Sequence, residues 1–438
     1  MTTYWAEHAL LPTGLASSVT LEVSEGRFAA ITANSGRGGA VHLPGIVLPG
    51  FANCHSHAFH RALRGRTHGG GGTFWTWRAS MYAVAARLTP DSYLALATAV
   101  YAEMALAGIT GVAEFHYLHH RADGTPYAET DAMGEALVEA ARLAGVRLTL
   151  LDTLYLSGGL TADGHLGPSA EQRRFDDGSV DRWAARLDRL SPDVSTRIGG
   201  AIHSVRAVPR DAIRAVPAIL RGLPLHVHLS EQPAENEACE AYYGCTPTRL
   251  LHDAGVLGPL TTAVHATHLT PDDVTLLGQS RTTTCLCPTT ERDLADGIGP
   301  ARALRDAGSP LSLGSDQHAV IDPFEEIRGL EGHERLRSLE RGRFTPADLL
   351  AAATAHASIG WPDAGALEPG ARADLVAVRL DTPRTAGADP SQIVHAATAS
   401  DIDTVIRDGV EVVRAGRHRL GDVGRLLAGA IAPLWEDR

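Results

Sequence analysis

The middle of this chain repeats one arrangement: a short apolar run that ends in polar residues, followed by a stretch with helical periodicity. The helical stretches 91–108 and 131–145 each close on a glycine, which suits a helix C-cap. Strand–helix units in succession predict an α/β fold, a (β/α)8 TIM-like barrel. The eight predicted strands are 45–55, 110–117, 146–155, 196–204, 224–231, 261–269, 282–291 and 310–318.

Both ends of the chain have a different texture. Residues 1–45 alternate apolar and polar side chains between turns, which is the period of antiparallel strands. The same pattern returns in 371–380 and 401–420. We therefore expect a small β-sandwich domain assembled from both termini. The predicted organisation is 1–46 for the N-terminal part of the sandwich, 47–362 for the barrel, and 363–438 for the C-terminal part with a terminal helix.

Composition narrows the functional class. Hydrophobic residues make up 44% and charged residues 21% of the 438, as in ordinary soluble globular proteins. The formal charge of −12 argues against a nucleic-acid or anionic-membrane partner. The sequence has neither a secretory-type start nor an apolar run of membrane-spanning length, so we expect a cytoplasmic protein.

Two residue types constrain the chemistry. Lysine is absent, and all 39 basic residues are arginine. Schiff-base chemistry and a carboxylated lysine that bridges two metals are therefore excluded. The five cysteines are few and odd in number, which favours reduced thiols.

Chemically capable side chains gather at the ends of the predicted strands. Since a barrel places its active site at the C-terminal rim, this placement supports the predicted architecture. The residues in these positions are His55, His57, Glu114, His116, Tyr117, Tyr155, His203, Arg206, His228, Glu231, His265, His268, Asp316 and His318.

His55 and His57 are the start of a predicted metal site. Residues two apart on a strand point the same way, so the two imidazoles project together and form half of a zinc-type site. Alone the pair is weak, because H-x-H occurs by chance in a chain with 21 histidines. The fifth strand offers His226 and His228, and the sixth offers His265 and His268. With Asp316 on the eighth strand, three histidines and one aspartate would complete a catalytic zinc site with a position left open for water.

These motifs resemble the amidohydrolase superfamily in its mononuclear deaminase branch: H-x-H on the first strand, H-x-x-E on the fifth, histidine on the sixth and S-D on the eighth. The terminal β segments, including 365–378, resemble its accessory sandwich. Over nearly the whole chain, the closer resemblance is to the N-formimidoyl-L-glutamate deiminases of histidine degradation. It rests on the segments HSHAFHRALRG, TFWTWRASMY, AEFHYLHH, HSVRAV and VHATH.

The resemblance implies roles for individual residues. His55, His57, His228 and Asp316 would bind one divalent metal, zinc most often, with iron or manganese compatible. Asp316 would accept a proton from the attacking water, and His265 would polarise that water. Glu231 would carry a proton to the departing nitrogen. The implied reaction converts N-formimidoyl-L-glutamate to N-formyl-L-glutamate and ammonia.

A substrate with two carboxylates requires fixed positive charge. Arg206, after the fourth strand, and Arg78, in the loop after the first, are the candidates. Tyr117, His203 and His60 match positions that add hydrogen bonds, although the family often has glutamine at the position of His60. The glycine-rich segment 67–78 would let the arm that carries Arg78 close over the site.

Two alternatives stay open. One is a deaminase or hydrolase that acts on a ring such as guanine, cytosine or a triazine, whose pocket would need aromatic and amide groups rather than two arginines. The other is a catalytically inactive scaffold, which would be expected to have lost metal ligands. The resemblance also implies a homodimer, and it leaves the aspartate homologue open as substrate.

Overall fold

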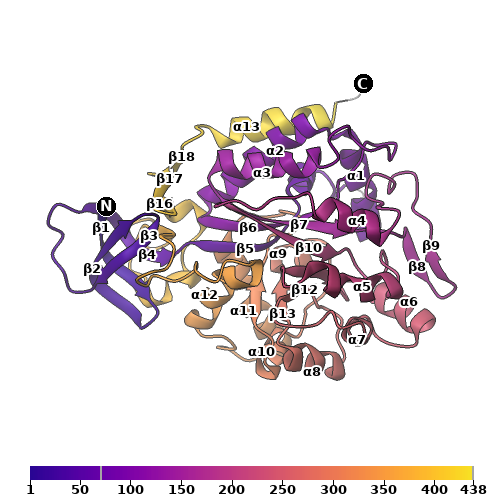
Figure 1. The fold of residues 1–438 in the computed structure, drawn as a ribbon. Helices are drawn as coiled ribbons and strands as arrows, with labels where there is room; N and C mark the ends of the chain where they lie inside the picture. Colours follow the sequence, from indigo (N-terminus) through magenta and orange to yellow (C-terminus); the bar gives the residue numbers. More distant parts are fainter. Residues whose placement is uncertain (70–71, 437–438) are drawn as a thin grey trace.

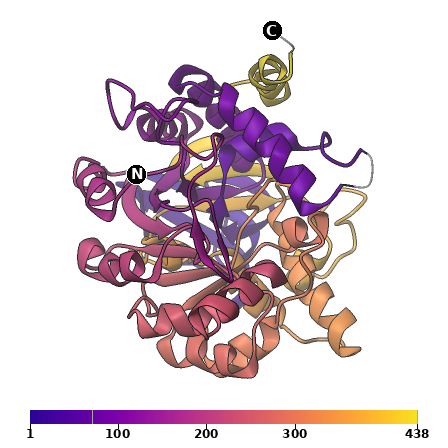
Figure 2. The same cartoon turned by 90° about the vertical axis from the view of Figure 1, so that its right-hand side faces the viewer.

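The centre of the chain is a barrel of parallel strands enclosed by helices (Figures 1 and 2). The computed structural model describes residues 1–69 and 72–436. Each predicted barrel strand overlaps an observed one, so the predicted fold is confirmed. In spatial order the strands are β5 (Phe51–Ser56), β6 (Ile109–His116), β7 (Arg147–Leu154), β10 (Thr196–Ile202), β11 (Leu225–Leu229), β12 (Thr261–His265), β13 (Thr283–Leu286) and β14 (Leu311–Leu313).

Helices follow the barrel strands and cover the outside of the barrel. Capping boxes begin several of them, for example Thr73 with Thr76 in the first helix, and Gly145 ends α3 with a φ of 83°. The helices are α1 (Phe74–Arg87), α2 (Pro90–Leu106), α3 (Ala132–Ala144), α4 (Val180–Leu187), α5 (Arg210–Leu220), α6 (Pro233–Tyr243), α7 (Pro247–Asp253), α8 (Pro271–Ser280), α9 (Pro288–Asp293), α10 (Ala301–Ala307), α11 (Pro323–Ser338), α12 (Pro346–Ala353) and α13 (Val423–Ile431). Short 3-10 helices are η1 (Ala58–Leu63), η2 (His356–Ile359), η3 (Pro390–His395), η4 (Ala399–Asp401) and η5 (Ala432–Leu434).

Both termini contribute to a second sheet, which lies at one end of the barrel (Figure 1). Figure 1 shows α1 and the hairpin of β8 (Gly159–Thr161) and β9 (Gly164–Leu166) at the opposite end. In spatial order the terminal sheet contains β18 (Arg417–His418), β17 (Val410–Arg414), β16 (Ile402–Arg407), β15 (Leu375–Val378), β4 (Val41–Pro49), β1 (Thr2–Leu11), β2 (Gly14–Ser24) and β3 (Arg27–Thr32).

The predicted first strand, 45–55, is wrong as one element. It divides between β4, which belongs to the terminal sheet, and β5, which belongs to the barrel. Gly50 is the junction: its N–H donates to the Asp374 carbonyl, and a Cβ there would lie 2.4 Å from the Thr110 hydroxyl. The predicted domain boundary after residue 46 therefore falls inside β4.

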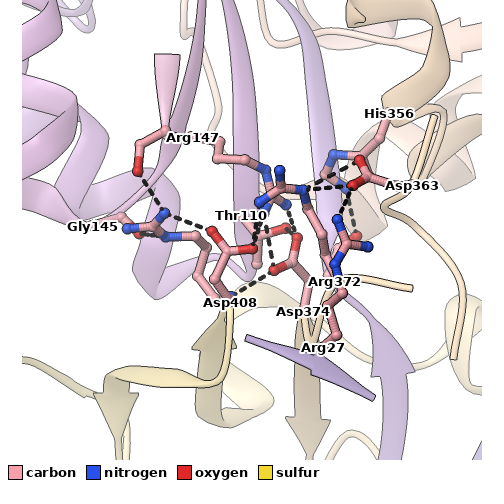
Figure 3. A network of polar contacts seen from close by, with 12 residues as sticks. Arg27, Thr110, Gly145, Arg147, His356, Asp363, Arg372, Asp374 and Asp408 are labelled. Carbon is pink, nitrogen blue, oxygen red and sulfur yellow. Dashed lines mark hydrogen bonds and ion pairs between the residues drawn. The ribbon is translucent and has the colours of Figure 1, made fainter. Parts of the chain in front are cut away.

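A buried polar network connects the terminal sheet to the start of β6 and β7 (Figure 3). Arg147 has no exposed surface and forms ion pairs with Asp374, which is equally buried, and with Asp408 at 2.7 Å. Thr110 donates to Asp374 as well. Removing one member of such a pair leaves an uncompensated buried charge, so the network holds the two parts in a defined arrangement.

Two apolar cores underlie this arrangement. The larger one runs through the barrel and its helices, and the smaller one lies within the terminal sheet and includes Val19, Phe28 and Leu375. Across the described residues, no helix combines the length and the hydropathy required to cross a membrane.

Candidate metal centre

Four buried side chains bring their ligand atoms together at the C-terminal ends of β5, β11 and β14. His55 Nε2 lies 3.1 Å from His228 Nε2 and 3.2 Å from Asp316 Oδ1. His57 Nε2 lies 3.4 Å from each of those two partner atoms. Ligands about 2.0–2.1 Å from a tetrahedral zinc are separated from one another by ~3.3 Å. The four predicted ligands therefore fit a divalent metal.

The ligands are held by the closure of the barrel itself. Asp316 N–H donates to the His55 carbonyl at 3.0 Å, and His57 N–H donates to the Asp316 carbonyl at 3.1 Å. These bonds join the end of β5 to the residues after β14. Gly314 permits the approach, because a Cβ at this position would lie 2.7 Å from the His55 Cβ.

Backbone carbonyls fix the orientation of two imidazoles. His57 Nδ1 donates to the Phe115 carbonyl at 3.0 Å, and His228 Nδ1 donates to the His203 carbonyl at 2.9 Å. The lone pair of each ring therefore lies on Nε2, which faces the centre. Burial lowers the pKa of His57 to about 3 and that of His228 well below its usual range, so both rings are neutral as ligands.

His265 and Glu231 lie beside the four ligands. His265 Nε2 is 3.8 Å from Asp316 Oδ2 and 3.8 Å from Glu231 Oε1. Burial raises the pKa of the Glu231 carboxyl, against the opposing charges of His265 and Arg206. His268, the other histidine of this segment, instead donates to the Asp296 carbonyl at 2.8 Å. Of the two histidines on the sixth strand, only His265 reaches the ligand cluster.

Backbone strain accompanies these positions. The φ angles are 68° at His265, 42° at Asp316 and 50° at Ser230, in the left-handed region that non-glycine residues avoid. Each such residue costs about 1–3 kcal/mol, and the surrounding structure must over-determine it. Two of these residues, His265 and Asp316, line the cavity described next.

A cavity opens onto the ligand cluster. All five predicted substrate-binding residues line it. The complete lining is His57, His60, Trp77, Arg78, Met81, Tyr82, Tyr117, Tyr155, Phe175, His203, Arg206, His228, Glu231, His265, Leu294 and Asp316.

One prediction about this lining needs correction. Arg78 lies on α1 rather than in a loop, because the Thr73 capping box starts a helix directly after the glycines. Residues 70–71 of the predicted lid segment lie outside the described residues. His60 lies on η1, and the centroid of its ring is 4.6 Å from that of His57.

The polar partners of the lining residues are specific. Arg206 Nε donates to Glu235 at 3.0 Å and its Nη2 lies 3.9 Å from Glu231 Oε2. Arg78 Nε donates to the Tyr82 hydroxyl at 2.7 Å. His60 Nε2 lies 2.9 Å from the Tyr117 hydroxyl.

Some residues of the site escaped the sequence prediction. Tyr155 was recognised at a strand end but was not given a role. Its hydroxyl accepts from Gln172, which also donates to Tyr82 at 3.2 Å. Tyr82 and Phe175 carry no local signal, since they reach the cavity from α1 and from a loop.

The comparisons with known proteins agree with this geometry. The Amidohydrolase family model matches residues 46–412. Formimidoylglutamate deiminase of Pseudomonas aeruginosa is 38% identical over 95% of this chain and 96% of its own length. The 8-oxoguanine deaminase of the same species is 30% identical over 87% of this chain and 85% of its own.

Solved structures show the same fold. The crystal structure of an amidohydrolase from Brucella melitensis superimposes with a TM-score of 0.92 at 32% identity, with both chains covered completely. A zinc-bound adenosine deaminase from Xanthomonas campestris has a TM-score of 0.83 at 22% identity, with 98% of this chain and 96% of its own covered. The chain therefore belongs to the amidohydrolase family and is a hydrolase that acts on carbon–nitrogen bonds.

Proposed function

We propose that the protein deiminates N-formimidoyl-L-glutamate, giving N-formyl-L-glutamate and ammonia, as a step of histidine degradation. The observation that carries this proposal is the pairing of two guanidinium groups, Arg78 and Arg206, with the candidate metal ligands in one small cavity. A substrate with one hydrolysable C–N bond and two carboxylates matches that arrangement. The 38% identity to a formimidoylglutamate deiminase supports the same choice.

The proposed cofactor is one divalent metal per chain, zinc with iron as the alternative, held by His55, His57, His228 and Asp316. Such an ion supplies Lewis acidity and lowers the pKa of water to near neutrality. Asp316 Oδ2 lies on the side of His265 and is the proposed acceptor of the proton that the attacking water loses. His265 Nε2 holds and orients that water.

Glu231 is the proposed proton carrier for the leaving group. Its carboxyl lies between His265 and Arg206, and burial raises its pKa toward a range in which it can both take and give a proton. Water adds to the formimidoyl carbon, the terminal nitrogen receives a proton from Glu231, and the C–N bond breaks. One water is consumed and one ammonia leaves. The other nitrogen of the formimidoyl group stays bonded to glutamate and becomes the amide nitrogen of the product.

The substrate's carboxylates are the proposed partners of Arg206 and Arg78. Guanidinium groups keep their charge at any working pH and match a carboxylate with two parallel donors. Tyr117, His203 and His60 line the same cavity and offer additional hydrogen bonds. We also propose that the protein is a cytoplasmic homodimer with no nucleic-acid or membrane partner.

A ring deaminase is the second candidate, because 8-oxoguanine deaminase of P. aeruginosa is 30% identical. Two arginines in the pocket weigh against it, since a neutral purine offers no charge for them to bind.

The test is ammonia release by the zinc-loaded protein from N-formimidoyl-L-glutamate, its aspartate homologue, guanine, cytosine and 8-oxoguanine. We expect the highest kcat/KM for the glutamate derivative and none of the rings turned over. Turnover of a ring alone would refute the proposal. A higher kcat/KM for the aspartate homologue would correct the substrate's chain length.

A further inference from the structure

A second carboxylate lies on the far side of His265. Glu291, in the first turn of α9, is buried, with 2% of its surface exposed, and its Oε1 is 3.6 Å from His265 Nδ1. On the opposite edge of the same ring, Nε2 faces Glu231 and Asp316. The two ring nitrogens therefore have different environments.

The Glu291 carboxylate is fixed in place. Its Oε1 accepts the N–H of Cys287 at 2.8 Å, which is the residue immediately before α9. His265 is held by the left-handed backbone at the end of β12. A rigid carboxylate opposite a rigid imidazole is the arrangement that selects one tautomer in acid–base sites.

A metal shared by His265, Cys287 and Glu291 is a different interpretation of the same cluster, since their ligand atoms lie within 4.8 Å of one another. Burial, together with Cys285, raises the pKa of the Cys287 thiol well above its usual range. In the absence of a metal this thiol is therefore protonated. The contact between His265 Nδ1 and Glu291 Oε1, at 3.6 Å, is an electrostatic pair that is slightly longer than a hydrogen bond.

We propose that Glu291 is a positioning residue whose carboxylate attracts the Nδ1–H of His265 and so keeps the Nε2 lone pair directed at the reacting water. The inference rests on the proposed hydrolytic function of the pocket. The proton that the attacking water loses passes to Asp316, so the Nδ1 proton of His265 stays where it is and Nε2 continues to orient the water. Glu291 contacts neither the candidate metal ligands His55, His57 and His228 nor the cavity that would hold substrate.

The chain offers a matched control. Glu326 of α11 is buried to a similar degree, with 3% exposed, and accepts from Thr289 N at 3.0 Å and Thr289 Oγ1 at 2.5 Å. It therefore supports the same first turn of α9 without touching His265. Glu326→Gln measures what the replacement of a buried carboxyl group at this helix start does by itself.

The experiment compares Glu291→Gln, Glu326→Gln, His265→Asn and the double variant Glu291→Gln/His265→Asn in the zinc-loaded protein. We expect Glu291→Gln to lower kcat by about 10–100-fold, with KM and zinc content unchanged, because it acts through the orientation of His265. Glu326→Gln should keep kcat within about twofold. In the His265→Asn background Glu291→Gln should lower kcat no further, since the partner through which it acts is already gone.

Three results would overturn the inference: unchanged kcat in Glu291→Gln, an equal loss in Glu326→Gln, or independent losses in the double variant. A second readout does not depend on activity. In chelator-treated protein, Glu291→Gln should shift Tm less in the His265→Asn background than in the parent, and equal shifts would also count against the pair. If the parent fails on N-formimidoyl-L-glutamate while the Tm shifts remain coupled, the proposed function is wrong and the contact stands.

Discussion

Replacing Arg206 by alanine separates the substrate-binding role of this residue from its structural one. Its guanidinium lines the cavity with only 17% of the side chain exposed. Nε donates to Glu235, which has no exposed surface and also accepts the N–H of Ser230 at 3.1 Å. The substitution therefore removes a substrate ligand and leaves a buried carboxylate with one partner fewer.

The magnitudes follow from these contacts. A hydrogen bond to a charged group contributes about 1.5–3 kcal/mol, so the loss of one carboxylate contact should reduce kcat/KM by about 10–150-fold, mainly through KM. Zinc content should not change, because Arg206 contacts none of the four ligands through an ion pair or hydrogen bond in the described part of the chain. The unpaired Glu235 should destabilise the fold by about 3–5 kcal/mol.

Steady-state kinetics, metal analysis and urea unfolding are measured together. Arg335→Ala is the matched control: Arg335 Nε donates at 2.6 Å to Glu331, a carboxylate with 2% exposed, far from the cavity. It should lower stability and leave KM unchanged. Arg206→Lys keeps the charge and should recover part of KM. Loss of zinc from Arg206→Ala, or an unchanged KM, would refute the reasoning.

Three other perturbations test the remaining parts of the account. Asp316→Asn removes both a metal ligand and the proton acceptor, so turnover should fall below detection in the ammonia assay; retained activity would show that the ligand assignment is wrong. Arg147→Met should lower the free energy of unfolding, measured in urea, by about 3–5 kcal/mol, because buried Asp374 loses its charged partner. KM should stay constant. The double variant with Asp374→Leu should recover most of the lost stability. Burial lowers the pKa of His356 to about 3, so the folded chain binds fewer protons than the unfolded chain between that value and about 6.5. The stability that neutral His356 contributes is complete above pH ~6.5. As the pH falls toward 3, the free energy of unfolding decreases by at most about 1.4 kcal/mol per pH unit. Urea unfolding of chelator-treated His356→Asn should therefore depend less on pH over this window, and an unchanged slope would contradict the assignment.

Local signals were sufficient for the barrel. Each parallel strand is buried on both faces and appears as a short apolar run, and polar residues mark where it ends. The candidate ligands His55, His57, His228 and Asp316 could be grouped from the sequence because strand ends of a barrel meet at one rim. The division of segment 45–55 into two strands could not be predicted, because an uninterrupted apolar run does not reveal that Gly50 packs closely against Thr110.

The partners of the site residues are the part that sequence could not supply. Glu235 meets Arg206, and Glu291 meets His265, only because the loops after neighbouring strands fold over the same rim. Neither glutamate belongs to a motif with fixed spacing. The left-handed backbone at His265 is likewise imposed by tertiary contacts and not by its residue type.

The central claim is that one metal, held by three histidines and an aspartate, supports deimination of a diacid. The most direct test is a zinc titration of chelator-treated protein, with ammonia release from N-formimidoyl-L-glutamate as the readout. The account predicts no activity without metal and a linear rise that saturates at one equivalent of zinc per chain. Saturation only at two equivalents, or full activity in the metal-free protein, would contradict it.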